Sequence, residues 1–348
     1  MQILPNAELC DFHTFSIQQT CKSLIIADSI EDIIQIYQNE TWSMLPKLVI
    51  GKGSNLLFTS PFNGVVIVNN LHGKSIHESE THWHLHISAG EDWPTLVRWT
   101  TDNGYFGLEN LAQIPGCCGS APIQNIGAYG VELSDVCQYV DILCLDTYTT
   151  KRLTKDECQF GYRDSIFKHS LFGRAIIIAV GLILKKKWQA NLSYGPLQAL
   201  DSTQVSAKEV FDTVTEIRAQ KLPDPSKVGN AGSFFKNPII PKVHFLELQQ
   251  RFPNIVGYPH SKGVKVAAGW LIEHSGLKGY QIGGAQVHPH QSLVLINRDH
   301  ATSQDIINLA SKVQATVFSN YQIQLEHEVR FIGTNGETDL QSILEQKS

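Results

Sequence analysis

Residues 114–130 have the sequence IPGCCGSAPIQNIGAYG, which contains four glycines and no charged side chain. Such a backbone can approach a large planar ligand closely, because glycine adopts conformations closed to other residues and no side-chain charge must be desolvated. We therefore predict that this loop wraps a nucleotide cofactor. A structural hairpin built from small residues is the alternative.

A second glycine turn, Gly51-Lys52-Gly53-Ser54-Asn55-Leu56-Leu57, follows the apolar segment 47–50. Its backbone N–H groups could face a phosphate. It is neither a Walker A loop nor a dinucleotide fingerprint, because position 56 is Leu. A plain tight turn would look the same, but two such loops on different α/β segments favour a cofactor held between domains.

The whole chain limits the classes of protein to consider. Its 348 residues, 42% hydrophobic and 18% charged, suit two or three globular domains. A net charge of −5 argues against nucleic-acid binding but not against a small anionic substrate. Seven cysteines without C-x-x-C spacing indicate reduced thiols. Because no signal segment is visible and the apolar run 175–184 is too short to span a membrane, we expect a cytoplasmic protein that binds no membrane. A monomer is also expected, although no sequence feature argues for it.

Hydrophobic periodicity predicts an alternation of strands and helices. Short buried strands are expected at 47–50 and 65–68, and mainly strands over 82–184, with one helix from Pro94 to Gly104. Further helices are expected after Ser29, over 207–220 and after Thr302. The segment Leu222-Pro223-Asp224-Pro225 should mark a domain boundary.

Arg163 is the first polar candidate outside the glycine loops. It lies in Gly161-Tyr162-Arg163-Asp164-Ser165, between apolar segments, where its planar guanidinium could clamp a carboxylate. A surface ion pair is the alternative.

Ser233 is the second candidate, in Gly229-Asn230-Ala231-Gly232-Ser233-Phe234-Phe235-Lys236-Asn237-Pro238. A poorly hydrated hydroxyl there could deliver a proton. A nucleophilic serine would need G-x-S-x-G and a histidine partner, neither of which is evident. A turn serine bonded to the backbone is the alternative.

The predicted strand 323–332 supplies a third group. Residues two apart share a face, so Glu326, Glu328 and Arg330 should point together. The solvated face of an edge strand would have the same pattern. The alternating histidines of 82–86 and 288–290 could suggest a metal, but a solvated face is favoured and we predict no metal site.

Taken in order, the segments 51–57, 114–130, 161–165, 229–238 and 328–333 closely resemble the UDP-N-acetylenolpyruvoylglucosamine reductase (UDP-N-acetylmuramate dehydrogenase) family of bacterial peptidoglycan synthesis. The resemblance implies an α+β protein with the FAD-binding fold of the vanillyl-alcohol-oxidase type. Residues 1–71 with 323–348, and residues 72–220, would form two FAD-binding subdomains. Residues 221–322 would form the substrate-binding domain.

The resemblance also implies a ping-pong cycle. NADPH reduces bound FAD and is replaced by UDP-N-acetylglucosamine enolpyruvate, whose C3 then receives a hydride from flavin N5. Arg163 and Glu328 would stabilise the negative charge that develops at C2 and the carboxylate, and Ser233 would protonate C2. Glu328 can do so only if it is protonated or hydrogen-bonded through water, because a bare carboxylate would repel that charge.

Other residues are assigned by the same resemblance. Arg218 and Lys221 would bind nucleotide phosphates, and Tyr194 resembles the mobile tyrosine of type I members. Shorter motifs add Asn237, Tyr258, Lys278 and Gln291 as substrate-binding residues. The residues that would bind FAD are Gly51, Gly53, Ser54, Asn55, Leu56, Ile114, Pro115, Gly116, Ser120, Ile123, Asn125, Gly127 and Arg330.

Small departures from the family pattern occur at Lys52 and at Cys117-Cys118, to which no role is attached. Two alternatives to the reductase are kept. One is a flavin oxidase or dehydrogenase of the same fold acting on another alcohol or sugar, and the other is a non-catalytic flavin-binding sensor.

Overall fold

The computed structural model describes residues 1–345, which divide into two compact units. Unit 1 comprises Met1–Asn6, Lys22–Lys52 and Gly64–Gln220. Unit 2 comprises Ala7–Cys21, Gly53–Asn63 and the chain from Lys221 onward. The finer division into three domains stays a prediction.

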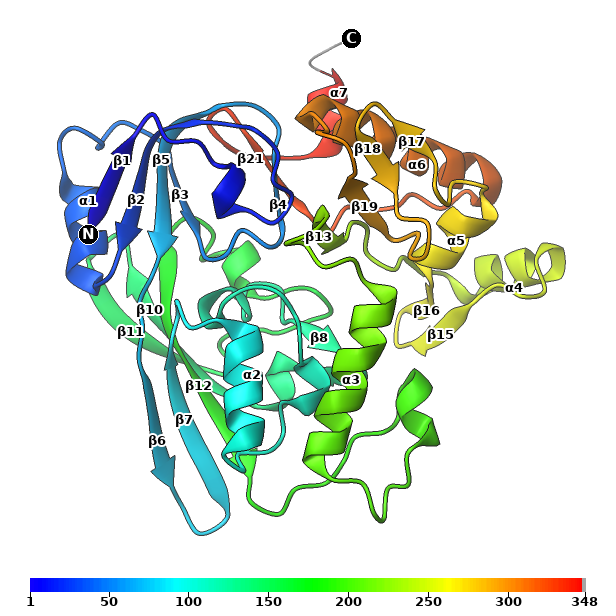
Figure 1. Ribbon diagram of the computed structural model, residues 1–348, viewed down its shortest axis with the longest axis horizontal. Coiled ribbons are helices and arrows are strands. Elements are labelled where there is room, and N and C mark those ends of the chain that lie inside the picture. Colours follow the sequence, from blue (N-terminus) through cyan, green and yellow to red (C-terminus); the bar gives the residue numbers. More distant parts are fainter. Residues whose placement is uncertain (346–348) are drawn as a thin grey trace. The chain divides into compact units, whose positions relative to one another are not determined.

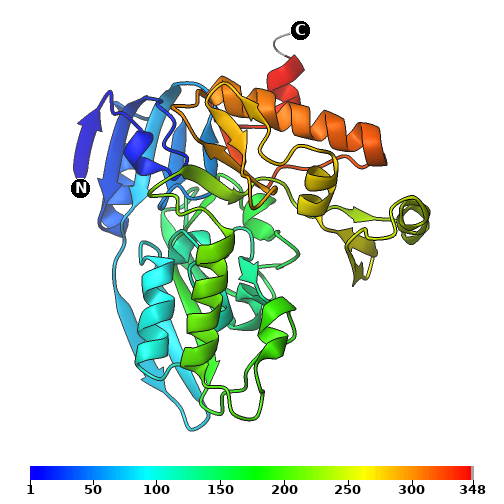
Figure 2. The same ribbon diagram turned by 45° about the vertical axis from the view of Figure 1, so that its right-hand side comes forward.

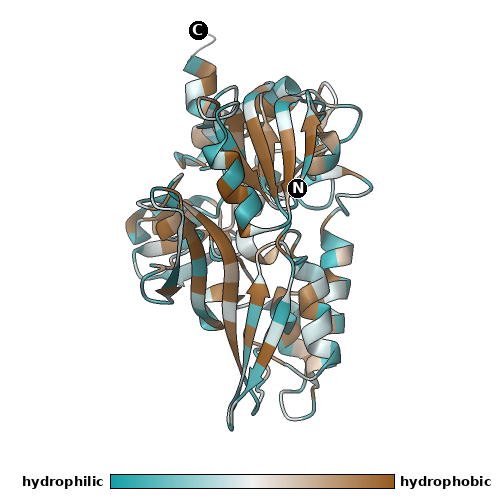
Figure 3. Cartoon of the chain, turned by 90° about the vertical axis from the view of Figure 1, so that its left-hand side faces the viewer, coloured by the Kyte–Doolittle hydropathy of each residue, from teal (hydrophilic) through white to brown (hydrophobic). Residues whose placement is uncertain are grey.

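The first sheet of unit 1 is mixed, with its strands in the order β1-β2-β5-β3. Its elements are β1 (Gln2–Pro5), β2 (Cys21–Ala27), helix α1 (Ile30–Gln38), β3 (Lys47–Ile50) and β5 (Phe62–Asn69). β3 and β5 are parallel. The helix begins as predicted, because the Ser29 hydroxyl accepts a hydrogen bond from Asp32 N at 3.0 Å. Apolar residues run along these strands in Figure 3.

The second sheet of unit 1 is antiparallel, in the order β11-β10-β12-β7-β6. Its strands are β6 (Lys74–Glu78), β7 (His82–Ser88), β10 (Cys137–Cys144), β11 (Thr149–Thr154) and β12 (Ala175–Lys185). Helices α2 (Trp93–Asp102) and α3 (Ala207–Lys221) lie side by side in Figures 1 and 2. Leu85 and Ile87 of β7 pack in one core with Val97 of α2 and Val214 of α3. These helices and strands agree with the predicted periodicity.

Short elements complete unit 1 around the glycine-rich loop. They are the 3-10 turns Glu109–Leu111, Cys118–Ser120, Leu133–Asp135, Ile166–Lys168 and Gly195–Ala199, and the two-residue strands β8 (Gly127–Ala128) and β9 (Val131–Glu132).

Unit 2 contains three small sheets. The first, in the order β13-β19-β18-β17, is formed by β13 (Gly229–Ser233), β17 (Gln281–Ile282), β18 (Ala285–Val287) and β19 (Val294–Asn297). The second is formed by β14 (Ile239–Ile240), β15 (Gly257–His260) and β16 (Gly263–Val266), and the third by β4 (Leu56–Phe58), β20 (Arg330–Gly333) and β21 (Gly336–Thr338). Its helices are α4 (Lys242–Arg251), α5 (Ala268–His274), α6 (Ser303–Tyr321) and α7 (Leu340–Glu345), besides the 3-10 turn Cys10–Phe12.

The predicted strand 323–332 is too long, because regular pairing is confined to β20. β20 runs parallel to β4, with Arg330 opposite Leu56. The preceding residues make isolated contacts with 234–236 instead of a continuous ladder, including the bridge between Phe235 and His327. The predicted alternation nevertheless holds: Leu325, Val329 and Phe331 are fully buried, while Glu326 is exposed.

Candidate active site

The glycine-rich loop 114–130 lies against the first glycine turn within unit 1. A Cβ atom built on Gly51 would overlap the Sγ atom of Cys117. A Cβ on Gly119 would lie 3.0 Å from the Cα of Ala89. Gly119 makes room for the backbone of Ala89, whereas Gly51 makes room for the side chain of Cys117. Ser120 closes the turn by donating to Cys117 O at 2.7 Å. The two loops predicted to hold the cofactor therefore touch.

Hydrogen bonds join the same loop to the turn that carries Arg163. The side-chain Nδ2 of buried Asn125 donates to Gly161 O at 3.1 Å, and Ser165 Oγ donates to Ile123 O at 2.7 Å. Arg163 Nη2 donates to Gly127 O at 2.9 Å. A Cβ on Gly127 would lie 3.2 Å from Arg163 Nη1, so the glycine makes room for the guanidinium. The sequence motifs gave no sign of this connection.

Arg218 and Tyr194, predicted to bind substrate, also contact the ends of the loop. Half-buried Arg218 donates from Nε to Gln113 O at 3.2 Å, directly before Ile114. Burial lowers the pKa of the Arg218 guanidinium, and nearby Tyr129 acts in the opposite direction. Tyr194 is 44% exposed and meets the ring of Tyr129 edge to face at 6.0 Å. Lys221, the last residue of α3, is exposed.

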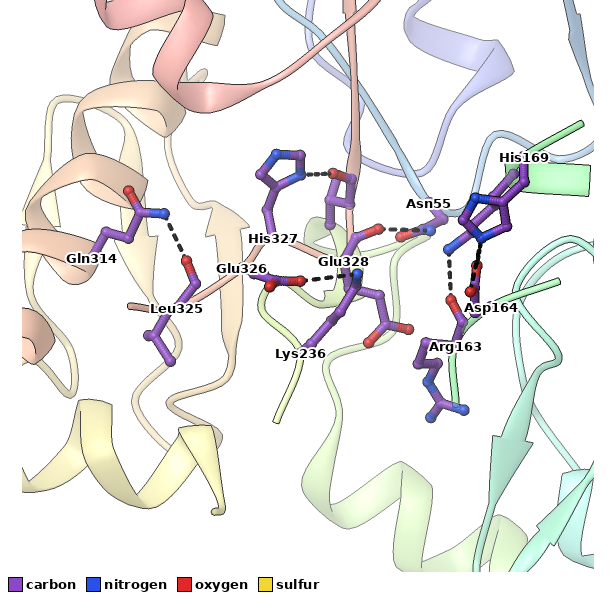
Figure 4. A network of polar contacts seen from close by, with 12 residues as sticks. Asn55, Arg163, Asp164, His169, Lys236, Gln314, Leu325, Glu326, His327 and Glu328 are labelled. Atoms are coloured by element: carbon purple, nitrogen blue, oxygen red, sulfur yellow. Dashed lines mark hydrogen bonds and ion pairs between the residues drawn. The ribbon is translucent and has the colours of Figure 1, made fainter. Parts of the chain in front are cut away.

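The second half of the first glycine turn belongs to unit 2. Gly53 has a φ of +61°, and a Cβ there would lie 2.7 Å from the Cβ of His13. Asn55 Nδ2 donates to Glu328 O at 3.2 Å, as Figure 4 shows, and Arg330 N donates to Asn55 O at 3.0 Å. The turn is therefore bonded to the segment that carries Glu328 and Arg330.

Ser233 ends β13 in a half-buried position. The preceding Gly232 has a φ of +70°, and its N–H donates to the side chain of Asn230 at 2.9 Å. The following Phe234 and Phe235 are fully buried. Within residues 1–345 the Ser233 hydroxyl has no hydrogen-bond partner. The alternative of a turn serine bonded to the backbone is therefore not what the structure shows.

Glu328 and Arg330 are both half-buried, as expected for one face of the segment. Glu328 N donates to Phe234 O at 2.8 Å, which joins it to the Ser233 segment. The Arg330 guanidinium pairs with Glu337 of β21 at 2.8 Å. Of the three predicted catalytic residues, Arg163 belongs to unit 1, whereas Ser233 and Glu328 belong to unit 2.

The remaining predicted substrate residues belong to unit 2 and have separate local contacts. Asn237 Oδ1 accepts a bond from Ala268 N at 2.9 Å, at the start of α5. Lys278 is exposed and pairs with Glu273 at 2.8 Å. Tyr258 of β15 is 40% exposed. Gln291 is half-buried, and its N–H donates to His288 Nδ1 at 3.0 Å. No interaction in the described chain bears on their assignment to substrate.

Two buried polar atoms beside Gly53 were missed by the sequence analysis. His13 Nε2 lies 3.1 Å from Ile17 O, so Nε2 carries the proton and Nδ1 is an acceptor. Neither that Nδ1 nor Thr14 Oγ1 has a partner among the described residues. Burying an unsatisfied polar atom costs about 1–3 kcal/mol. Polar groups of a nucleotide cofactor would fit such atoms. The sequence around them, Phe12-His13-Thr14-Phe15-Ser16, carries no signal that would have found them.

The histidines of β7 have local side-chain partners. No cluster of metal-ligating side chains occurs in the part of the chain that the structure describes. His84 contacts Gln138 and Ser79, and His86 contacts Tyr139.

Among residues 1–345 no helix is long and apolar enough to cross a membrane.

The known proteins that match this chain match it over the segments that contain these motifs. Residues 224–332 match the protein family described as UDP-N-acetylenolpyruvoylglucosamine reductase, C-terminal domain, and residues 22–151 match the FAD binding domain. The UDP-N-acetylenolpyruvoylglucosamine reductase of Vibrio vulnificus is 57% identical over 343 residues, covering 99% of each chain. The chain belongs to the UDP-N-acetylenolpyruvoylglucosamine reductase family. The family predicted from the motifs is confirmed.

Other members of the reductase family agree. The enzyme of that name from Vibrio cholerae is 54% identical over the full length of both chains. The solved structure of UDP-N-acetylenolpyruvylglucosamine reductase from Thermus caldophilus has a TM-score of 0.66 at 23% identity, covering 95% of this chain and 98% of that one. This likeness and the FAD-binding match confirm the predicted α+β, FAD-binding fold.

Proposed function

We propose that the chain catalyses the NADPH-dependent reduction of UDP-N-acetylglucosamine enolpyruvate to UDP-N-acetylmuramate, a step in bacterial cell-wall biogenesis that supports cell shape and division. The observation that carries the proposal is the 57% identity to a UDP-N-acetylenolpyruvoylglucosamine reductase over 99% of both chains. Arg163, Ser233 and Glu328 are the residues to which we assign the chemistry.

When bound, FAD would supply the hydride-transfer chemistry between NADPH and the enolpyruvyl group. The touching loops at Gly51 and 114–130 would hold it in unit 1. Gly53, Ser54, Asn55, Leu56 and Arg330 would do so in unit 2, beside the buried atoms of His13 and Thr14. We propose Gly116, Ser120, Ile123 and Gly127 as backbone contacts, because such groups carry no charge to desolvate.

Arg163 would bind the carboxylate of the enolpyruvyl group. A guanidinium presents a planar fork that matches two carboxylate oxygens. When hydride reaches C3, negative charge builds at C2 and spreads into that carboxylate, so a fixed cation there lowers the barrier. The bond from Arg163 Nη2 to Gly127 O holds the guanidinium in place before the substrate arrives.

Ser233 would donate its hydroxyl proton to C2 and complete the reduction. A hydroxyl with no internal partner in the described chain can turn toward the substrate without breaking a bond. A serine is a weak acid, but the electron-rich C2 is a strong enough base to take its proton. Glu328 would support the intermediate through a protonated carboxyl group or a bridging water, because an ionised carboxylate would repel it.

We further propose that the protein works in the cytoplasm as a monomer on small-molecule substrates, without nucleic-acid or membrane partners. All seven cysteines lie in the described chain and are free thiols, which suits a reducing compartment. The net charge of −5 gives no reason to expect nucleic-acid binding. Light scattering of the purified protein would measure its oligomeric state.

Anaerobic flavin absorbance tests the proposed reaction. NADPH should bleach the bound flavin, and UDP-N-acetylglucosamine enolpyruvate should restore its colour while UDP-N-acetylmuramate forms. If only oxygen restores the colour, the protein is an oxidase of the same fold and the proposal is wrong. If NADPH does not bleach the flavin at all, the sensor is favoured instead.

A further inference from the structure

We propose that Glu132 is a positioning residue for Arg163 and acts through the side chain of Asn125. The inference rests on the proposed function for the role of Arg163, and on contacts within unit 1 for the role of Glu132. Asn125, assigned by resemblance to the cofactor, is the link between the two residues.

The Asn125 side chain is 1% exposed and bonded on all sides. Its Nδ2 donates to Glu132 Oε2 at 2.8 Å and to Gly161 O at 3.1 Å. Its Oδ1 accepts from Ser134 N at 2.9 Å. Two acceptors face the NH₂ group and one donor faces the oxygen, so only one orientation of the amide satisfies them. Without the Glu132 acceptor, a buried N–H would lose its partner.

Gly161 O is the carbonyl that closes the turn carrying Arg163. Asp164 N donates to Gly161 O at 3.3 Å, and Gly161 N donates to Asp164 O at 2.9 Å. Between them Arg163 has a φ of +54°, a left-handed conformation that costs a non-glycine residue about 1–2 kcal/mol. A turn that contains this strain needs outside support. Asn125 supplies it at Gly161 O, and Lys168 supplies it by donating to Arg163 O at 2.8 Å.

The contacts return to Glu132 through Gly127. Gly127 of β8 and Glu132 of β9 are direct partners in their short ladder. Gly127 O accepts the bond from Arg163 Nη2, and a Cβ on Gly127 would lie 2.9 Å from Glu132 Cγ. A closed circuit of contacts thus runs from Glu132 through Asn125, the Gly161 turn, Arg163 and Gly127 back to Glu132. Glu132 is joined to it by both its backbone and its carboxylate.

The circuit predicts a specific effect on the reaction. Loss of the Glu132 acceptor would loosen the Gly161 turn, and the Arg163 guanidinium would lose its fixed position. Small displacements of a positioned group can cost up to about 100-fold in rate. Arg163 acts only on the enolpyruvyl substrate, so reduction of the flavin by NADPH should not depend on the circuit.

Three variants of the FAD-loaded enzyme test the proposal. Glu132→Ala should slow substrate-driven flavin reoxidation about 10-fold to 100-fold and leave NADPH bleaching and flavin content within about twofold of wild type. Glu132→Gln keeps an acceptor oxygen, so it should restore reoxidation to near the wild-type rate. Glu132→Asp withdraws the acceptor by one methylene and should fall in between. Glu78→Ala is the control, because this exposed carboxylate of β6 pairs with Lys186 and not with the circuit, and it should change neither half-reaction.

Several results would overturn the inference. One is an equal loss of both half-reactions in Glu132→Ala, or in Glu132→Asp if the alanine variant does not fold. Another is a Glu132→Gln variant as slow as Glu132→Ala, since the charge and not the acceptor would then matter. A wild-type rate in Glu132→Ala would also contradict it. Failure of the wild-type enzyme to be reoxidised by the enolpyruvyl substrate would instead reject the proposed function, so the two failures are distinguishable.

Discussion

The backbone N–H of Glu328 donates to the carbonyl oxygen of Phe234 at 2.8 Å. Phe234 follows Ser233 directly, so this bond joins the segment of the proposed proton donor to that of the proposed carboxyl group. Lys236 N donates to Glu326 O at 2.9 Å and continues the same pairing. The rings of Phe234 and Phe331, 5.8 Å apart, pack beneath it. The segments that carry Ser233 and Glu328 are therefore joined by one set of backbone bonds.

Ser233→Ala should separate the two half-reactions. We expect bleaching by NADPH at the wild-type rate and substrate-driven reoxidation slower by about 10²–10⁴-fold, as for the loss of a general acid. Folding should be unaffected, because the hydroxyl has no hydrogen-bond partner within residues 1–345. Stopped-flow absorbance of the flavin measures both rates.

Ser226→Ala is the control for that variant. Its hydroxyl only caps a local turn by donating to Asp224 at 2.7 Å, so neither rate should change. An equal loss of both half-reactions in Ser233→Ala would contradict the proton-donor role.

Arg163→Lys should impair the same half-reaction for a different reason. Lysine keeps the charge but lacks the planar fork, so it cannot reproduce the bond to Gly127 O together with bidentate binding of a carboxylate. We expect a higher KM for the enolpyruvyl substrate and reoxidation slower by about 10-fold or more. Arg174→Lys, at an exposed pair with Asp146, is the control and should behave as wild type. Unchanged reoxidation in Arg163→Lys would rule out the proposed carboxylate clamp.

Sequence alone predicted elements whose signals are local. Helix α6 begins where its capping residues Thr302 and Asp305 indicate, and the apolar run 175–184 forms β12. The predicted strand 323–332 was too long, because side-chain alternation reports burial and not regular pairing. Sequence alone also could not show that Asn125 bonds to Gly161, since that contact depends on how distant segments pack. His13 and Thr14 were missed because nothing beside them marks a buried polar atom.

Gly53→Ala should destabilise the protein more than an ordinary change from glycine. The added Cβ would meet strain at a φ of +61° and also overlap the backbone of Phe12 and His13. Together these should lower the free energy of unfolding by about 2–5 kcal/mol. Urea denaturation followed by tryptophan fluorescence measures the change.

Gly276→Ala separates the cost of the left-handed backbone conformation from the cost of the steric overlap. Gly276 has a φ of +73° with no atom within 4 Å of a built Cβ. This variant should lose only about 1–2 kcal/mol, the usual cost of the left-handed conformation. Equal losses in the two variants would show that the contact between Gly53 and His13 carries no weight.

His13 should make the stability of the protein depend on pH. Burial lowers the pKa of the His13 imidazole from 6.5 to about 4, because the charged form is poorly hydrated there. The unfolded chain therefore binds a proton between about pH 6.5 and 4 that the folded chain does not. The resulting stabilisation is fully present above pH 6.5 and is lost as the pH falls toward 4. Its upper limit is about 3 kcal/mol.

Urea denaturation at pH 7 and at pH 4.5 would measure this dependence, with His13→Gln as the comparison. A glutamine keeps a donor that can reach Ile17 O but has no group that titrates in this range. The free energy of unfolding should therefore fall less between the two pH values in the variant than in the wild type, and the difference reports the His13 contribution. The same slope in both proteins would mean that other groups cause the acid sensitivity. It would also mean that the His13 ring is not kept neutral by burial.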